Sequence, residues 1–295
     1  MCGISAFIGN KNAFKRILDS LLQLQNRGYD SAGISVLENG EIITRKHAST
    51  NEHTALDLLS TYNYESNIGI GHTRWATHGA KTDINSHPHV SFNSKFSLVH
   101  NGIIENYQEI KTFLASKGIN NKSQTDTEVI VNLIAHHFEE SSNVMDAIEK
   151  TTEQLTGTWG IAVLYKDEPN KIYCTRHGSP LLIGVDDAMA MVTSEQSGFC
   201  NLFTKYIVLN NRDICTIEYT DDKIKIVTKD VYVEKNTLNT NNVLTPAPYP
   251  HWTIKEINEQ IDSSLRAISL GGRLLSSNEV KLGGLDDNVD TLREI

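Results

Sequence analysis

The chain has 295 residues, of which 39% are hydrophobic and 21% charged, a composition typical of globular proteins with a sizeable core. Its formal net charge of −9 provides no basic surface for a phosphate backbone, so nucleic acid is not expected as a partner. The sequence has no apolar run of about 18 residues and no basic region followed by an apolar stretch. We therefore expect neither a membrane partner nor a secretory signal, and a cytoplasmic location.

The four cysteines are widely spaced and form no C-x-x-C element, so neither a disulfide framework nor a zinc site is predicted. Cys174, Cys200 and Cys215 are expected to be buried apolar thiols. Cys2 is different because of its position. A small residue at position 2 normally allows Met1 to be removed, which would leave one residue bearing both a thiol and a free α-amine.

The first half of the chain begins with a strand at residues 4–8 and a helical apolar pattern at residues 14–24. Strands at residues 32–37 and 41–45 flank Asn39-Gly40, a strong hairpin signal. Further strands are predicted at residues 67–73, 96–101, 160–165, 171–176, 181–185, 190–193, 206–209, 213–218 and 223–227. Helices are predicted at residues 106–116, 128–138 and 144–155.

Strands in hairpin order with helices grouped between them indicate an α+β protein built from antiparallel sheets covered by helices. After about residue 233 the composition changes, with a polar stretch and three prolines (Pro246, Pro248, Pro250) before a helical segment at residues 254–268. We therefore expect a catalytic or binding domain over residues 2–233. Residues 234–295 are expected to form a linker and a connection to something further.

Chemistry at Cys2 requires a base, and an α-amine with a reference pKa of about 7.7–8.0 can accept a thiol proton near neutral pH. On position alone, however, a cysteine that merely starts a strand is the stronger interpretation. Other motifs must decide between the two.

One such motif is the run of residues 71–79, followed by Ser-His-Pro-His at residues 86–89. Arg74 could bind a substrate carboxylate with both arms of its guanidinium, with Thr77 and His78 adding neutral hydrogen bonds. The alternative for Arg74 is a solvated surface charge. The clustered histidines lack a helical i, i+4 pair and a neighbouring cysteine, so packing and hydrogen bonding are favoured over a metal site.

Two further sites carry suitable groups. Asn101 and Gly102 end an apolar strand with a side-chain amide and an approachable backbone N–H, which together would make an oxyanion hole. Taken alone, an Asn-Gly hairpin turn is the stronger interpretation. Asp126 could hold an ammonium group, but it lies in a capping-box pattern at residues 125–128 and, read in isolation, is better explained as a helix cap.

Together these segments resemble the glutaminase domain of the class II (N-terminal nucleophile) glutamine amidotransferases. The resemblance rests on Met1-Cys2-Gly3-Ile4, on Asn26-Arg27-Gly28-Tyr29-Asp30-Ser31-Ala32-Gly33, on residues 72–79, on Asn101-Gly102 and on Thr125-Asp126-Thr127-Glu128. Within that family, these runs and the segment at residues 250–260 are more similar to glutamine:fructose-6-phosphate aminotransferases than to phosphoribosyl amidotransferases or asparagine synthetases.

The resemblance implies a four-layer αββα sandwich, the N-terminal nucleophile hydrolase fold, and an enzyme that hydrolyses L-glutamine to L-glutamate and ammonia without cofactor or metal. It implies a thioester on Cys2, formed through a tetrahedral oxyanion that Asn101 and the Gly102 N–H stabilise. The remaining implied roles are carboxylate binding by Arg74, Thr77 and His78, ammonium binding by Asp126, lining of the site by Arg27, Gly28, Gly79 and His87, and gating by Trp75.

Two departures from the family pattern stand out. Ile261 replaces a proline usual in the family's linker, and the sequence ends at Ile295, where the family's sugar-phosphate isomerase half should begin. The expected partner is therefore an isomerase domain or subunit that binds fructose 6-phosphate, and a homo-oligomer is a further candidate assembly. A non-catalytic glutamine-binding regulatory module, and a glutaminase half serving another acceptor, remain alternatives.

Overall fold

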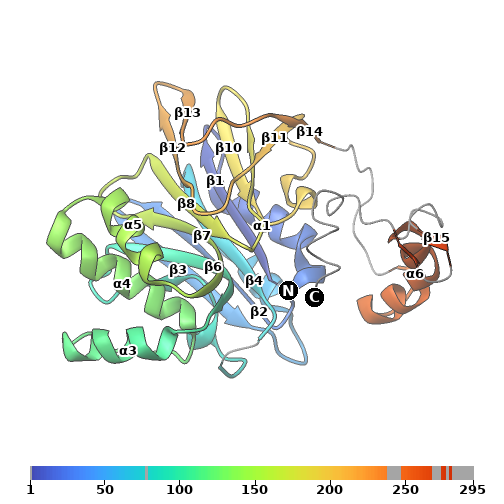
Figure 1. Ribbon diagram of the computed structural model, residues 1–295, viewed down its shortest axis with the longest axis horizontal. Coiled ribbons are helices and arrows are strands. Elements are labelled where there is room, and N and C mark those ends of the chain that lie inside the picture. Colours follow the sequence, from blue (N-terminus) through green and yellow to red (C-terminus); the bar gives the residue numbers. More distant parts are fainter. Residues whose placement is uncertain (1, 77–78, 238–246, 268–273, 277–278, 281–295) are drawn as a thin grey trace. The chain divides into compact units, whose positions relative to one another are not determined.

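The computed structural model describes residues 2–76, 79–237, 247–267, 274–276 and 279–280. The chain divides into two compact units, Met1–Asn242 and Val243–Ile295, which are described separately. In the first unit two sheets pack face to face, with helices on the outer face of each (Figure 1). The predicted α+β class and four-layer αββα arrangement are confirmed.

The larger sheet has eight strands in the described part of the chain, and every neighbouring pair in it is antiparallel. In order across the sheet the strands are β14 (Lys235–Asn236), β11 (Lys205–Val208), β9 (Leu182–Val185), β10 (Met189–Thr193), β1 (Gly3–Gly9), β4 (Ile68–Arg74), β2 (Ser31–Glu38) and β3 (Glu41–Ala48). The first strand of the chain therefore lies in the interior of the sheet, between β10 and β4.

The smaller sheet has six strands among the described residues and is also antiparallel. In order they are β13 (Lys223–Val227), β12 (Ile214–Thr220), β8 (Lys171–His177), β7 (Gly157–Tyr165), β6 (Phe96–Ile104) and β5 (His89–Val90). Its central pair, β6 and β7, has a long register in which Asn101 lies opposite Gly160 and Gly102 opposite Trp159.

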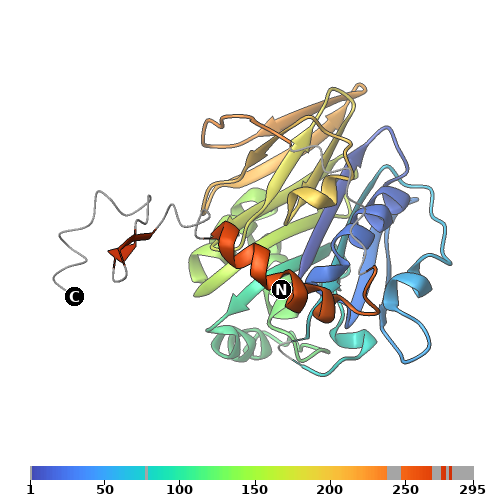
Figure 2. The same ribbon diagram turned by 90° about the vertical axis from the view of Figure 1, so that its right-hand side faces the viewer.

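Helices cover the outer faces of the two sheets. The helices on the larger sheet are α1 (Ala13–Gln23) and α2 (Ala55–Leu59), and those on the smaller sheet are α3 (Tyr107–Ser116), α4 (Asp126–Ser141) and α5 (Val144–Gln154). Figure 1 shows α3, α4 and α5 together on one side, and Figure 2 shows α1 against the other. Short 3₁₀ helices span Gln25–Arg27, Asp83–Asn85 and Gln196–Phe199.

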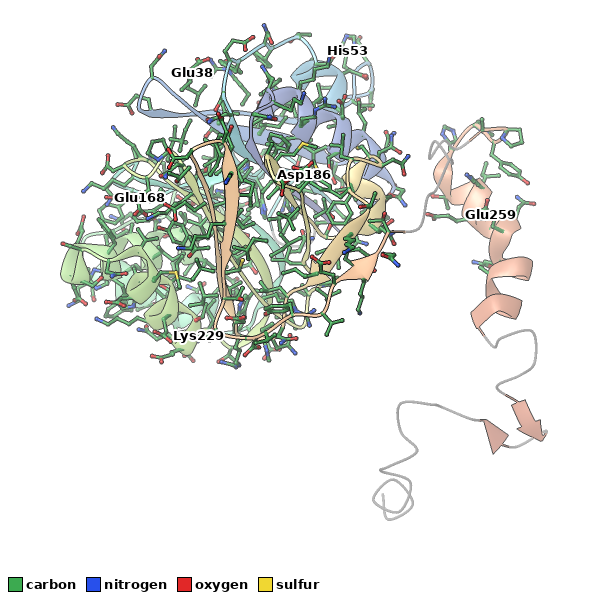
Figure 3. All side chains as sticks on the ribbon, turned by 90° about the horizontal axis from the view of Figure 1, so that it is seen from above. Glu38, His53, Glu168, Asp186, Lys229 and Glu259 are labelled. Atoms are coloured by element: carbon green, nitrogen blue, oxygen red, sulfur yellow. The ribbon has the colours of Figure 1, made fainter. Side chains whose placement is uncertain are left out.

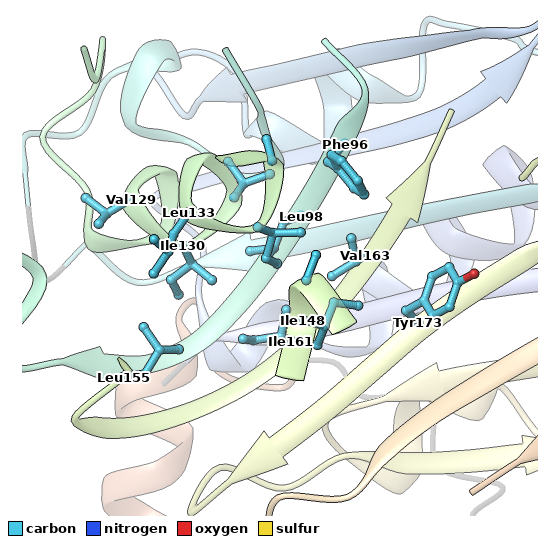
Figure 4. Packing of buried hydrophobic residues seen from close by; sticks show 14 of the residues in the cluster. Phe96, Leu98, Val129, Ile130, Leu133, Ile148, Leu155, Ile161, Val163 and Tyr173 are labelled. Carbon is cyan, nitrogen blue, oxygen red and sulfur yellow. The ribbon is translucent and has the colours of Figure 1, made fainter. Parts of the chain in front are cut away.

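The strand period of two divides apolar residues among three cores. On β1, Ile4 and Ile8 face the core between the sheets, whereas Phe7 faces the core under α1. On β6, Val99 faces the core between the sheets, whereas Leu98 packs with Ile130 and Ile148 of the helices (Figure 4). β1 is buried along its whole length and on both faces, which explains why its sequence is almost continuously apolar.

Two Asn-Gly pairs in the sequence have opposite outcomes. Asn39 and Gly40 both have positive φ, 54° and 76°, and join β2 to β3, so the predicted hairpin is confirmed. Asn101 and Gly102, in contrast, lie within β6 and pair with β7, so the hairpin-turn interpretation of that dipeptide is wrong.

In the second unit the described residues contain the helix α6 (Trp252–Ala267) and a small sheet of β15 (Leu274–Ser276) and β16 (Glu279–Val280). α6 begins before the predicted residue 254, and residue 268, where the prediction ended, lies outside the described residues. Among the helices that the structure describes, none is long and apolar enough to cross a bilayer. Polar side chains such as Glu38, His53 and Lys229 lie at the surface of the first unit (Figure 3).

Candidate active site

Cys2 directly precedes β1 and receives contacts from three distant parts of the chain. Its Sγ accepts a hydrogen bond from the backbone N–H of Trp75 at 3.3 Å. Its carbonyl oxygen accepts hydrogen bonds from Nε of Arg27 and from Nδ2 of Asn101, both at 2.9 Å. The residue that starts the chain's first strand is thus fixed by the loop before β2, the end of β4 and the middle of β6.

The surroundings of the Cys2 thiol have opposing effects on its pKa. Burial raises its pKa, while the Trp75 N–H and the positive charges of Arg74 and Arg27 lower it, and the raising effect prevails. The thiol is therefore the resting form near neutral pH. Nucleophilic attack from this position requires a base that removes the thiol proton.

Two hollows meet at Cys2. The first hollow, about 300 Å³, is lined by Cys2, Arg74, Trp75, His87, His100, Gly102, Thr125, Asp126 and Thr127. The second hollow, about 780 Å³, is lined by Cys2, Arg27, Trp75, Asn101, Gly102, Ile103, Thr158, Ser179 and Pro180. Both are bordered by Cys2, Trp75 and Gly102, so the sulfur has access to two chemically different spaces.

Opposite charges face the first hollow. Arg74, the last residue of β4, is only 4% exposed, so its interpretation as a solvated surface charge is wrong. Its guanidinium donates to the carbonyl oxygens of Gly79 at 3.3 Å and Ala80 at 3.4 Å. Asp126, 5% exposed, accepts from the Ile104 N–H at 3.0 Å. A buried cation and a buried carboxylate beside one nucleophile suit a zwitterionic ligand.

The start of α4 differs from its predicted capping box. The N-cap is Thr125, whose side chain accepts from the Glu128 N–H, so Asp126 is the first helical residue and not the cap. The Glu128 carboxylate accepts from the N–H groups of Lys122 and Ser123 and thus holds the preceding loop. Because Thr125 caps the helix, the carboxylate of Asp126 can border the first hollow.

Gly102 occupies a position that a larger residue cannot take. Its φ is +137°, and a Cβ atom there would lie 2.1 Å from the carbonyl oxygen of Thr158. The backbone next to Asn101 therefore borders both hollows without a side chain in the way. A side-chain amide and an approachable backbone segment at the nucleophile meet the requirement for an oxyanion site.

The histidines that the sequence brings together also lie together in space. The rings of His72 and His87 stack with centroids 4.1 Å apart, and His87 lies 5.1 Å from His89. Burial lowers the pKa of His72 to about 3, and burial with neighbouring positive charge lowers the pKa values of His87 and His89 well below their ordinary value. These rings are neutral near pH 7, and that of His87 borders the first hollow.

A tight backbone approach lies next to Trp75, where Gly28 meets the end of β4. A Cβ at Gly28 would lie 2.6 Å from the carbonyl carbon of Arg74, so only glycine lets these segments meet. Arg27 forms an ion pair with Glu195 at 2.7 Å. Trp75 is 43% exposed and contacts Tyr29 edge to face, with ring centroids 5.5 Å apart. The indole of Trp75, which contacts Tyr29 at the surface, therefore borders both hollows.

Most of the residues singled out in the sequence are therefore brought together at Cys2: Arg27, Gly28, Arg74, Trp75, Gly79, His87, Asn101, Gly102 and Asp126. Thr77 and His78 lie outside the described residues. The sequence reasoning missed Glu195, which pairs with Arg27, and Thr127 and Thr158, which border the hollows. No local pattern marks these three, because only the tertiary fold brings them to Cys2.

Comparisons with known proteins agree with this geometry. Residues 72–201 match the sequence family described as a glutamine amidotransferase domain. The chain is 41% identical over 268 residues to a probable glutamine–fructose-6-phosphate aminotransferase (isomerizing) of Acanthamoeba polyphaga mimivirus, covering 88% of this chain and 44% of the relative. It is 34% identical to the corresponding aminotransferase of Caldanaerobacter subterraneus, covering 100% of this chain and 48% of the relative. The chain thus spans about half the length of the curated relatives it matches.

Among solved structures, the chain is similar to the glutamine phosphoribosylpyrophosphate amidotransferase of B. subtilis, with a TM-score of 0.62 and 24% identity over 77% of this chain and 49% of that chain. A structure titled as the allosteric regulatory enzyme of purine biosynthesis has a TM-score of 0.63, with 24% identity over 77% of this chain and 48% of that chain. At this identity the likeness establishes the fold, which is that of the amidotransferases. The chain belongs to the glutamine amidotransferase family, and within it is homologous to part of the glutamine–fructose-6-phosphate aminotransferases.

Proposed function

We propose that this chain hydrolyses L-glutamine to L-glutamate and ammonia through a thioester on Cys2. The observation that carries the proposal is that Cys2 accepts a hydrogen bond from an amide donor, Asn101, and borders the same hollow as two buried opposite charges, Arg74 and Asp126. A docking pocket for glutamine would use the charges, but it would have no use for a nucleophile beside an amide donor.

The substrate's charged end is assigned to the first hollow. Arg74 would bind the α-carboxylate, because a guanidinium presents paired N–H groups to a carboxylate plane. Asp126 would bind the α-ammonium, and His87 would border the bound molecule as a neutral ring. Thr77 and His78 are assigned to the same carboxylate on sequence grounds, and Gly79 to the loop that Arg74 holds through its carbonyl oxygen.

The reaction then proceeds by acyl transfer. The Cys2 thiol loses its proton to the α-amine that removal of Met1 would expose, and the sulfur attacks the side-chain amide carbon of glutamine. Nδ2 of Asn101, which has a second N–H besides the one directed at the Cys2 carbonyl oxygen, and the Gly102 N–H stabilise the oxyanion. The C–N bond breaks, the nitrogen leaves as ammonia with the transferred proton, and water hydrolyses the thioester to glutamate.

The second hollow is assigned to the departing ammonia. Ile103 and Pro180 give it apolar walls, and Trp75 borders it and the first hollow alike. Trp75 would thereby control passage between the two spaces, and Arg27 and Gly28 would support the nucleophile from this side. The names of the relatives suggest fructose 6-phosphate as the acceptor, bound by an isomerase domain or subunit.

For the chain as a whole, we assign residues 2–233 to the glutaminase and residues 234–295 to the connection with the acceptor part. We place the protein in the cytoplasm, where thiols stay reduced, because the cysteines are free thiols and one of them is the proposed nucleophile.

The test is release of glutamate from glutamine by the purified chain. We expect activity in the unaltered protein, a loss of at least about a thousandfold in Cys2→Ala, and a change within about twofold in Cys200→Ala, a matched control at another partly buried thiol. Mass spectrometry should find Met1 removed and, after acid quenching, a glutamyl adduct on Cys2. Absence of glutamate, or equal release from Cys2→Ala, would refute the proposal in favour of a binding module.

A further inference from the structure

The side-chain amide of Asn101 has an oxygen side and a nitrogen side, and only the nitrogen side can donate a hydrogen bond to an oxyanion. In the structure Nδ2 is directed at Cys2 and donates to its carbonyl oxygen at 2.9 Å. Oδ1 is directed at His72, whose Nε2 lies 2.9 Å away. A flipped amide would set two oxygen atoms against each other at Cys2, so the orientation of this group decides whether the site can stabilise negative charge.

The neighbours of His72 define which of its ring nitrogens carries the hydrogen. Nε2 lies within hydrogen-bond distance of two acceptors, Oδ1 of Asn101 at 2.9 Å and the carbonyl oxygen of His100 at 3.0 Å. Nδ1 is buried and has no hydrogen-bond partner among the described residues. Because an unpaired buried N–H costs more than an unpaired lone pair, the hydrogen belongs on Nε2. His72 then offers Asn101 a donor, which only the amide oxygen can accept.

We propose that His72 is a positioning residue for the oxyanion donor: its Nε2–H holds Oδ1 of Asn101 and thereby keeps Nδ2 turned toward Cys2. The inference rests on the proposed glutaminase function and adds a residue to its machinery. His72 itself touches neither the nucleophile's sulfur nor, in this assignment, the substrate, and acts through Asn101.

The same hydrogen bond joins the two halves of the site. His72 lies on β4, opposite Ile4 of β1, in the larger sheet that carries Cys2. Asn101 lies on β6 in the smaller sheet. The contact therefore crosses between the sheets and fixes the donor relative to the nucleophile. Burial of His72 lowers its pKa to about 3, so the ring keeps one hydrogen over the working pH range.

A second contact between the same sheets provides a matched control. Oγ of Ser97 on β6 donates to Oγ of Ser35 on β2 at 2.8 Å, and both side chains are fully buried. Ser97 precedes Asn101 on the same strand and borders neither hollow. Loss of this bond should weaken the packing of the sheets without turning the Asn101 amide.

The experiment compares His72→Gln with His72→Asn in the glutaminase assay, together with Asn101→Ala. The glutamine side chain carries its amide nitrogen about as far from the backbone as Nε2 of histidine, whereas the asparagine amide falls short of Asn101. We expect kcat to fall about a hundredfold or more in Asn101→Ala and about tenfold in His72→Asn, with KM within about twofold in the latter. His72→Gln should recover kcat to within about threefold of the unaltered chain.

Combining the variants separates positioning from general destabilisation. On the Asn101→Ala background, His72→Asn should reduce kcat by less than about twofold more, because the group that it positions is already gone. Ser97→Ala should lower the melting temperature while kcat stays within about twofold. If His72→Asn does not fold, His72→Leu takes its place in the same comparison.

Several outcomes would overturn the inference. Losses that multiply in the double variant, a His72→Gln variant as impaired as His72→Asn, or an unchanged kcat in His72→Asn would each remove His72 from the positioning role while leaving an active glutaminase. If the unaltered chain released no glutamate from glutamine, the proposed function itself would be refuted. The two failures are therefore distinguishable.

Discussion

The two hollows beside Cys2 differ in the chemistry of their walls. The first hollow is bordered by a buried cation, a buried carboxylate and the neutral ring of His87, whereas the second combines Ile103 and Pro180 with Arg27, whose charge is paired with Glu195. Full charges that face a small hollow can hold a zwitterion, but they would hinder the passage of a small neutral product. In the proposed function, this difference separates recognition of the substrate from release of ammonia, with Cys2 bordering both hollows.

The sharpest way to break this comparison is to remove the cation of the first hollow. Arg74→Met should lower kcat/KM for glutamine about 100- to 1000-fold, mostly through KM, because truncating one partner of a buried charge pair costs about 2–5 kcal/mol. Arg45→Met provides a control, since its exposed guanidinium lies over the rings of Tyr62 and Tyr64. An unchanged KM in Arg74→Met would show that the substrate carboxylate binds elsewhere.

Removing the negative charge of Asp126 should have a smaller effect on kcat/KM, and one that depends on the substrate's α-amino group. Asp126→Asn keeps an oxygen for the Ile104 N–H but removes the charge, so kcat/KM for glutamine should fall about 10- to 100-fold. Glutaramate, the glutamine analogue that lacks the α-amino group, is the diagnostic substrate. Its slower hydrolysis should be nearly the same in both proteins, and an equal loss with both substrates would contradict the assignment of the ammonium to Asp126.

Acid should destabilise the region of the first hollow, because buried histidines lie at and beside it. The pKa of His72 is lowered to about 3, and those of His87 and His89 are lowered well below 6.5, with Arg74 and Lys46 adding positive charge nearby. A lowered pKa means that the stability contribution is complete above about pH 6.5 and is lost as pH falls toward the folded value, at up to about 1.4 kcal/mol per pH unit for each ring.

Urea unfolding at a series of pH values measures this dependence. Below about pH 6.5, His89→Gln should reduce the slope of unfolding free energy against pH by up to about one proton. His53→Gln, at an exposed ring on the surface (Figure 3), controls for the loss of an imidazole as such. An unchanged slope in His89→Gln would mean that this ring does not contribute to the acid sensitivity.

A substitution at the second hollow should change kcat and leave KM nearly unchanged. Arg27→Met removes the Nε hydrogen bond to the Cys2 carbonyl oxygen, and a hydrogen bond of this kind contributes about 1 kcal/mol, so kcat should fall about five- to tenfold with KM nearly constant. Steady-state kinetics distinguishes the two parameters. A rise in KM as large as that of Arg74→Met would remove the distinction between the hollows.

Local signals in the sequence were sufficient where neighbouring residues decide the structure. Asn39-Gly40 makes a hairpin because both residues take positive φ within a two-residue turn. The same dipeptide at Asn101 was misjudged as a turn when read alone, because its conformation depends on β7, whose residues come more than fifty positions later. Pairing across such a separation leaves no mark in a short window of sequence.

The candidate site followed from the sequence only once its motifs were considered together. The burial of Arg74 comes from the packing of the strand ends around it, and the Arg27–Glu195 pair joins two loops that no local pattern connects. The capping-box pattern identified the start of α4 and the bond from the Glu128 N–H to Thr125, but not the partners of the Glu128 carboxylate, which are the N–H groups of Lys122 and Ser123. The sequence thus predicted which residues carry chemistry. It did not predict the contacts that only the tertiary fold creates.

The interior place of β1 also has a consequence for the order of events during synthesis. Ser5 pairs with Gly71 on one side and with Thr193 on the other, so the strand that carries Cys2 gains its second neighbour only after Thr193 has been made. Cys2 is among the first residues to leave the ribosome and among the last to reach its final surroundings. A nascent chain that ends before β10 therefore carries the proposed nucleophile without the sheet that holds it, so the proposed glutamine hydrolysis should begin late in translation.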